Sequence, residues 1–227
     1  LCDMCFMTKC PYVPPHEFNL DFPHLMLRYR AAELAAGKVP SMARQLTETD
    51  RNGRLASKVP GLANWVSDTK NAMTRPLLET VAKVDRAAAL PKYFGRTLVR
   101  RAKDDPPAVD RTAPGFGRKA VVYATCFSNY NDPAVGESAL KVLAKNGVET
   151  RVEYPSCCGM PQLEHGDIAS VAEKAKRVAA AFGPMIDEGW DVIALVPSCA
   201  LMMKFEWPLI LPDDPAVRKL AEATYDL

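Results

Sequence analysis

The pattern of apolar and polar positions changes near the middle of the chain. Over residues 21–37 and, in pieces, over 41–104, the pattern favours helices separated by proline and glycine breakers. Residues 105–118 are rich in proline, glycine and charge, a composition typical of a linker. From residue 119 onward, short β-branched apolar runs alternate with amphipathic stretches. We therefore expect a helical region, a linker and a domain of a different class.

The second half of the chain predicts three strands and three helices. The strands are expected over 119–126, 148–154 and 191–198, and the helices over 133–146, 167–182 and 215–224. Strands alternating with helices are typical of an α/β domain with a parallel sheet. The expected buried stripes are Val135, Ala139, Val142 and Leu143 on one helix, and Ile168, Val171, Ala175, Val178 and Phe182 on the next. Because the chain ends on helical sequence, we expect the domain over 119–227 to continue in a longer protein.

Charge and composition narrow the class of protein. The chain has 227 residues and a net charge of +2, so it offers no electrostatic case for binding nucleic acid. No apolar run reaches the roughly 18–20 residues that a membrane span needs. No secretory signal stands at the start. We expect a cytoplasmic protein, and peripheral contact with the inner face of a membrane stays open.

The seven cysteines are clustered, and this clustering suggests the chemistry. They are Cys2, Cys5, Cys10, Cys126, Cys157, Cys158 and Cys199. A secreted disulfide framework would be shorter and more evenly spaced. Clustered cysteines in a chain without a signal indicate ligands of a metal or an iron–sulfur cluster in a reducing compartment, with buried structural thiols as the alternative.

Four of these cysteines follow the predicted strands. Cys126 ends the first strand, Cys157 and Cys158 follow the second, and Cys199 follows the third. The carboxyl ends of parallel strands share one edge of the sheet, so these loops converge. Four thiols from three loops are therefore expected at one site.

The adjacent pair Cys157–Cys158 needs an irregular turn if both side chains are to face one site. Pro155 and Gly159 on either side favour such a turn. Three interpretations stay open: an iron–sulfur cluster, a tetrahedral zinc ion, and a vicinal disulfide or two buried thiols.

Three stretches around these cysteines resemble a known family. "CFSNYNDP", "PSCCGMPQLEHGD" and "VPSCALMMKFEWP" are similar to the cysteine-rich CCG domain of heterodisulfide reductase subunits. They look especially like the iron–sulfur subunits of anaerobic glycerol-3-phosphate dehydrogenase and of glycolate oxidase. The resemblance implies a Rossmann-like parallel domain over 119–227 with a 4Fe–4S cluster on these four cysteines. It also implies that backbone amides of the turn at Gly159 hydrogen-bond the cluster.

One position departs from the fullest form of the family's motif, which ends in Cys-x-x-Cys. This chain has Met202 where the last cysteine would stand. The missing fifth thiolate argues against a non-cubane cluster and against disulfide-cleaving chemistry, whereas four thiolates suffice for a cubane. A thioether is a weak ligand, so we expect Met202 to pack in the core.

The first three cysteines resemble the tail of a ferredoxin motif. Cys2-x-x-Cys5 followed by Cys10-Pro11 is similar to the bacterial form, with four residues instead of three before the last cysteine. We expect residues 1–20 to be the C-terminal half of a 4Fe–4S ferredoxin-type module in an interior piece of a longer protein. Cys2 and Cys5 would bind one cluster and Cys10 another. A zinc site that adds His16 is the rival interpretation.

The fold class we expect is thus α/β: a ferredoxin-type remnant over 1–20, a helical region over 21–104, a linker over 105–118 and a cysteine-rich domain over 119–227. The expected function is electron transfer in an oxidoreductase complex, between ferredoxin-type clusters and the cluster of the CCG domain. A flavoprotein dehydrogenase or another redox subunit would be the partner and would carry the catalysis. Thiol–disulfide catalysis and a zinc-stabilised binding module are the alternatives.

Overall fold

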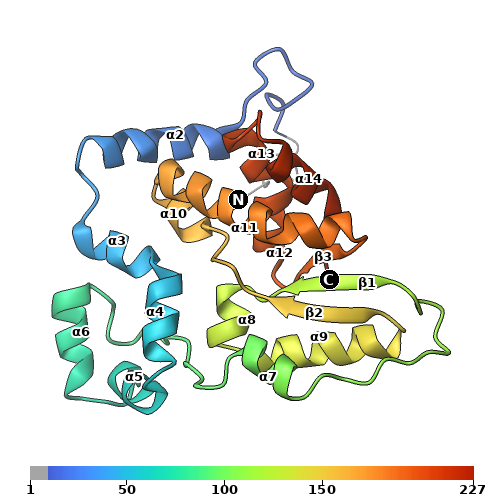
Figure 1. Ribbon diagram of the computed structural model, residues 1–227. Helices are drawn as coiled ribbons and strands as arrows, with labels where there is room; N and C mark the ends of the chain where they lie inside the picture. Colours follow the sequence, from blue (N-terminus) through green and yellow to red (C-terminus); the bar gives the residue numbers. More distant parts are fainter. Residues whose placement is uncertain (1–9) are drawn as a thin grey trace.

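Four parallel strands form one sheet at the centre of the second half of the chain. The computed structural model describes residues 10–227. The strands are β1 (Lys119–Tyr123), β2 (Glu149–Glu153), β3 (Asp191–Ala194) and β4 (Thr224–Asp226), in the order β2-β1-β3-β4. Figure 1 shows β1 and β2 side by side. All three neighbouring pairs are parallel. The prediction of an α/β, Rossmann-like parallel domain is confirmed. The expected number of three strands was wrong, because β4 follows directly on the last predicted helix.

Both faces of the sheet are buried, which explains the apolar run of the central strand. Along β1, Val121 and Tyr123 belong to one core cluster, whereas Val122 belongs to another on the opposite face. All three are fully buried. Side chains alternate across a strand, so an apolar run without polar interruptions is what a strand covered on both sides requires.

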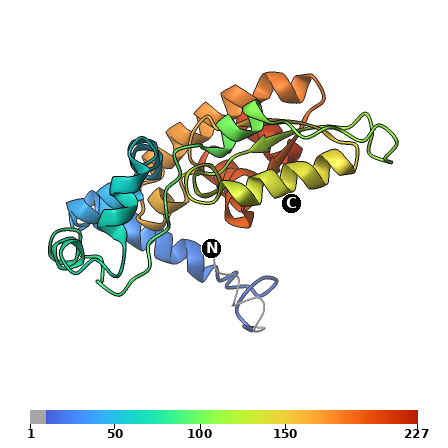
Figure 2. The same cartoon turned by 90° about the horizontal axis from the view of Figure 1, so that it is seen from below.

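Helices cover the two faces in separate layers. Helices α7 (Leu98–Asp104) and α9 (Pro133–Lys145) pack with β2 on one side. Helices α11 (Ile168–Asp187) and α14 (Pro215–Ala223) pack with β3 on the other. Figure 2 shows α9 and α11 on opposite sides of the strands. Because helices cover both faces of the sheet, the ends of the strands are the part of the sheet that the two helical layers leave uncovered.

The buried faces of these helices were predicted with mixed success. On α11 the expected stripe is confirmed for Val171, Ala175, Val178 and Phe182. On α9 the expected stripe is confirmed for Ala139 and Leu143 and was wrong for Val135 and Val142, which are 48% and 56% exposed. The face that packs contains Pro133, Gly136, Ala139, Leu140, Leu143 and Ala144. Gly136 lets α9 approach closely, since a Cβ there would lie 2.1 Å from a methyl of Leu98.

The first half of the chain is helical in pieces, as predicted. Besides α7, its helices among the described residues are α2 (Phe22–Ala35), α3 (Ser41–Thr47), α4 (Thr49–Ala56), α5 (Pro60–Ser67) and α6 (Thr74–Ala82). Residues 105–118 contain no helix or strand. Within the described residues, no helix combines the length and the apolar character that a membrane crossing needs.

Short helices join the helical region to the sheet domain. Helix α4 packs on α8 (Cys126–Tyr130), and α2 and α3 pack on α10 (Met160–Glu164). The approach of α4 depends on Gly53, because a Cβ there would lie 2.3 Å from the ring of Tyr130. After β3 the chain forms α12 (Pro197–Leu201), a π-helical turn η1 (Met202–Glu206) and α13 (Trp207–Ile210). These short elements were not predicted, and three of them carry the cysteines or adjoin them.

Candidate functional site

The carboxyl ends of β1, β2 and β3 bring four cysteines together. Cys126 begins α8, where Thr125 caps the helix by accepting the N–H of Ser128 at 3.2 Å. Cys157 and Cys158 lie in the loop between β2 and α10, and Cys199 lies in α12. The sheet order places β1 between β2 and β3, so the three loops adjoin.

The sulfur atoms of these cysteines form two contacts. The Sγ atoms of Cys126 and Cys157 are 3.7 Å apart, and those of Cys158 and Cys199 are 3.2 Å apart. Cys157, Cys158 and Cys199 are buried, and Cys126 is partly exposed. The structure therefore brings together the four thiols that the sequence placed at one edge of the sheet.

Gly159 makes the turn after the cysteine pair. It has a φ of +84°, in the left-handed region that favours glycine, and it precedes the first turn of α10. Its N–H donates to the Sγ of Cys157 at 3.5 Å. A backbone amide of this turn thus already points at one of the sulfurs.

Two buried aromatic side chains hold the carbonyl groups of the same loop. The hydroxyl of Tyr123 donates to the carbonyl of Ser156 at 2.6 Å, and the indole N–H of Trp207 donates to the carbonyl of Cys158 at 3.1 Å. Both side chains are fully buried. A buried carbonyl without a partner is costly, so these bonds help to fix the backbone on either side of Cys157.

A residue that the sequence did not indicate, Asp50 of α4, holds the loop from outside the sheet domain. Its carboxylate accepts the N–H of Cys157 at 2.8 Å, the hydroxyl of Ser156 at 3.3 Å and the hydroxyl of Tyr154. The ammonium of Lys174 on α11 lies 2.7 Å from the same carboxylate. Burial lowers the pKa of Lys174, but the contacts with Asp50 outweigh that effect and leave the pKa raised.

The thiols shift one another's protonation. Contact with Cys157 raises the pKa of Cys126, and burial adds to the increase. Contacts with Cys157 and Cys199 likewise raise the pKa of Cys158. The contacts with Cys126 and Cys158 lower the pKa of Cys157. Four buried thiolates would repel one another, so a bound cation is what would allow all four to ionise.

The hydroxyl of Thr49 gives a second indication that the cysteines face a binding site. Its oxygen is buried without a hydrogen-bond partner among the described residues. It lies close enough to Cys126 and Cys157 to lower the pKa of each thiol. An unpartnered buried hydroxyl costs free energy unless a bound group accepts from it. Together with four thiols, this donor set fits an iron–sulfur cluster or a thiolate-bound metal.

Within residues 10–227, no group of three or more His, Cys, Asp or Glu side chains is arranged to hold a single metal ion. The four thiols contact one another in pairs instead. Met202 is fully buried in η1 and belongs to the core cluster that contains Cys158 and Cys199. It packs beside the site as part of the core, as expected from its apolar side chain.

The remaining sequence candidates stand near the start of the chain. Cys2 and Cys5 fall outside the described residues, and Cys10 is a free, partly exposed cysteine. The ring of His16 contacts Tyr12 and Phe18, with centroids 5.4 Å and 4.8 Å away. A site on Cys2, Cys5 and Cys10, with or without His16, stays a prediction.

The comparisons with known proteins agree with this arrangement. The model of the family described as "Cysteine-rich domain" (CCG) matches residues 120–204. A subunit of the anaerobic glycerol-3-phosphate dehydrogenase of Escherichia coli is 29% identical over 177 residues, which cover 74% of this chain and 42% of that protein. Lactate utilization protein A of Bacillus velezensis is 31% identical over 116 residues, which cover 48% of this chain and 46% of that protein.

The chain thus spans less than half the length of the curated relatives it matches. No solved structure matches the chain. The region matched by the family model contains all four cysteines that meet at the sheet edge. Residues 120–204 therefore match the cysteine-rich domain of the CCG family, with all four cysteines inside the matched region.

Proposed function

We propose that the chain is part of an iron–sulfur electron-transfer subunit of an oxidoreductase. The observation that carries the proposal is the meeting of Cys126, Cys157, Cys158 and Cys199 at one sheet edge, with sulfur contacts of 3.7 Å and 3.2 Å. The match to the CCG family and the similarity to a dehydrogenase subunit support a redox role.

These four cysteines would hold a 4Fe–4S cluster, which would supply one-electron oxidation and reduction. The N–H of Gly159 would donate a hydrogen bond to a sulfur of the site, as it does to Cys157, and the Thr49 hydroxyl has no other partner among the described residues. Hydrogen bonds to sulfur and exclusion of water set the potential of such centres. The protein's own contribution is thus a dry pocket whose loop is fixed by Tyr123, Trp207 and Asp50.

The wider arrangement follows from the same proposal. Cys2, Cys5 and Cys10 would bind ferredoxin-type 4Fe–4S clusters over residues 1–20, joined through the helical region 21–104 and the linker 105–118 to the cysteine-rich domain 119–227. A flavoprotein dehydrogenase or another redox subunit would exchange electrons with the protein and act on the substrate. The protein would work in the cytoplasm, with peripheral contact at the inner face of the membrane as an alternative.

The experiment that tests the cluster is iron, sulfide and zinc analysis of the anaerobically purified protein, with its visible absorption spectrum. A 4Fe–4S site predicts about four iron atoms and four sulfides for the CCG site, with broad absorption in the visible range. Cys158→Ser should lose the iron of this site. Ser198→Ala is the matched control, since it changes the residue beside Cys199 without removing a thiol.

A zinc site is the second candidate, and one observation favours it. Zn–S bonds of about 2.3 Å in a tetrahedron place neighbouring sulfurs about 3.8 Å apart. The Cys126–Cys157 distance of 3.7 Å is close to this value, although the Cys158–Cys199 distance of 3.2 Å is shorter. A colourless protein with one zinc and no sulfide would establish this candidate and overturn the iron–sulfur proposal.

A further inference from the structure

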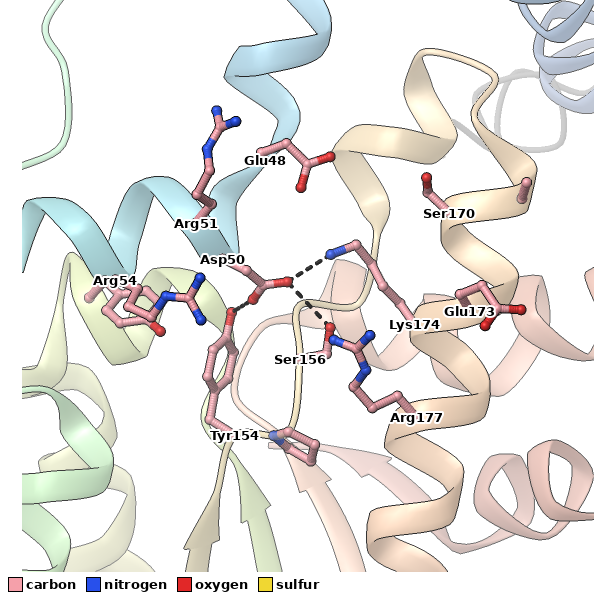
Figure 3. A pocket seen from close by; sticks show the side chains of 13 residues that line it. Glu48, Asp50, Arg51, Arg54, Tyr154, Ser156, Ser170, Glu173, Lys174 and Arg177 are labelled. Carbon is pink, nitrogen blue, oxygen red and sulfur yellow. Dashed lines mark hydrogen bonds and ion pairs between the residues drawn. The ribbon is translucent and has the colours of Figure 1, made fainter.

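A pocket of about 610 Å³ lies beside the cysteine loop, outside the site described above. Helix α4 forms one wall and α11 the other, and the segment Tyr154–Ser156 lies between them (Figure 3). This volume falls within the range of pockets that hold small molecules, roughly 300–1,000 Å³. The pocket therefore has the size of a binding site for a small ligand.

The acidic group at its base is already neutralised. The carboxylate of Asp50 lies 2.7 Å from the ammonium of Lys174 and accepts the hydroxyls of Tyr154 and Ser156 (Figure 3). It also accepts the N–H of Cys157. Its side chain is 27% exposed and that of Lys174 is 12% exposed. Asp50 thus has few lone pairs left, and its charge does not repel an anion as a free carboxylate would.

Three arginines of the lining have no carboxylate partner among the described residues. Arg54 extends from α4 and Arg177 from α11, and both reach into the pocket from opposite sides (Figure 3). Within the described residues neither forms an ion pair. A third arginine of the pocket, Arg51, donates to Gln45 and Asn52 instead.

The other carboxylates of the pocket do not cancel these charges. Glu173 is 72% exposed and lies 3.3 Å from the ammonium of Lys176 on its own helix. Glu48 is the one acidic side chain of the lining for which no ion pair is formed among the described residues. The pocket therefore presents three guanidinium groups without an ion pair, one of them bonded to neutral amides, against a single unpaired carboxylate.

We propose that this pocket binds a small oxyanion, a carboxylate or a phosphate, held between Arg54 and Arg177. The guanidinium group presents paired N–H donors that match two oxygens of either anion. The hydroxyl of Ser170, which donates to Asp167 at 2.8 Å, and the ring of Pro155 also line the pocket. The bound anion would lie next to Asp50, whose carboxylate also accepts the N–H of Cys157. Binding of the anion would therefore act on the hydrogen bond that holds the cysteine loop. This proposal does not depend on the nature of the cluster.

The test is calorimetric titration of the purified chain with inorganic phosphate and, separately, with acetate at constant ionic strength. Saturable binding of at least one anion is expected, and the tighter of the two identifies the preferred class. Arg54→Gln and Arg177→Gln should each weaken binding about tenfold, the loss expected for a charge-assisted hydrogen-bond pair. Glu48→Gln should tighten binding, because it removes the unbalanced negative charge.

Arg111→Gln is the matched control, since Arg111 is an exposed arginine outside the lining. It should bind the anion as the unaltered chain does. The proposal is overturned if neither anion binds saturably, or if all three arginine variants bind with equal affinity. Iron content is not a readout here, so a negative result leaves the cluster proposal untouched, and a zinc-loaded or empty cysteine site leaves this proposal untouched.

Discussion

The carboxylate of Asp50 accepts the backbone N–H of Cys157 at 2.8 Å, although the two residues are 107 positions apart in the chain. Asp50 belongs to the helical region and Cys157 to the cysteine loop of the sheet domain. One side chain of the first region thus takes part in fixing the backbone of the candidate site.

Asp50→Ala should destabilise the protein by about 2–3 kcal/mol, because it leaves the mostly buried Lys174 without its partner and three donors without an acceptor. Urea unfolding measures this loss. The rate at which Cys157 reacts with iodoacetamide in the metal-free chain should also rise, since the loop is no longer held.

Asp104→Ala is the control for this prediction. Asp104 pairs with Arg96 at 2.8 Å, but the side chains are 47% and 60% exposed, so the loss should stay below about 1 kcal/mol. Equal losses in the two variants would contradict the role given to Asp50. Lys174→Met in the Asp50→Ala background should recover part of the stability, because it removes the unpaired charge.

Gly159→Ala should destabilise the protein by about 1–2 kcal/mol, because an L-residue is strained at a φ of +84° and its Cβ would lie 3.3 Å from Val171. Gly183→Ala, inside α11, should stabilise it by about 0.5–1 kcal/mol, since nothing lies within 4 Å of the added Cβ. Thermal unfolding of the two variants checks both signs. A stabilised Gly159→Ala variant would mean that the turn does not need a left-handed residue.

Met202→Leu should leave the metal content of the CCG site unchanged and cost less than about 1.5 kcal/mol, because it nearly conserves the volume of a fully buried side chain. Met202→Ala should cost about 2–5 kcal/mol through the cavity it leaves. Metal analysis beside urea unfolding separates packing from ligation. Loss of metal in the leucine variant, with stability kept, would instead make the thioether a ligand.

The ring of His24 joins α2 to η1, with Nδ1 2.5 Å from Asp21 and Nε2 3.2 Å from Glu206. Partial burial lowers the pKa of His24, but the two carboxylates outweigh this and raise it above 6.5. A group whose pKa is raised by folding stabilises fully below its unfolded value and loses that contribution as pH rises through the folded value.

The stability difference between the unaltered chain and His24→Gln should therefore be largest below about pH 6.5 and shrink as pH rises above the folded pKa. Urea unfolding of both proteins between about pH 5.5 and pH 8.5 measures it. A difference that grows with pH would have the wrong sign and would rule out a charged His24 between the two helices.

The convergence of the four cysteines could be predicted because it follows from a topological rule: residues after parallel strands meet at one edge. The period of the apolar stripe also located the buried face of α11. The same reasoning misplaced part of the face of α9, because Gly136, which lets the helix approach Leu98, carries little hydrophobic signal. Which face of α9 is buried depends on the shape of the surface that it packs against, and the sequence of α9 alone does not give that shape.

The contributions of Asp50, Thr49 and Trp207 could not be predicted from the residues that flank them in the sequence. Those residues are equally compatible with an exposed acid at 50, an ordinary threonine at the start of a helix at 49 and an ordinary core aromatic at 207. The hydrogen bonds of Asp50 and Trp207 to the cysteine loop span 107 and 49 residues of sequence. Strand β4 was missed for a related reason. The three residues of β4 directly follow a helix and are too few to show an alternation of apolar and polar positions. Only their pairing with β3 makes them a strand.

The Cys158–Cys199 contact bridges 41 residues and the Asp50–Cys157 contact bridges 107. Contacts of such long sequence separation cost loop-closure entropy, because the chain between them must be ordered for them to exist. The candidate site is thus complete only when the sheet and the helical region have docked. A group that binds these cysteines would capture the folded chain as a whole, and its affinity would add directly to the resistance of the entire protein to unfolding.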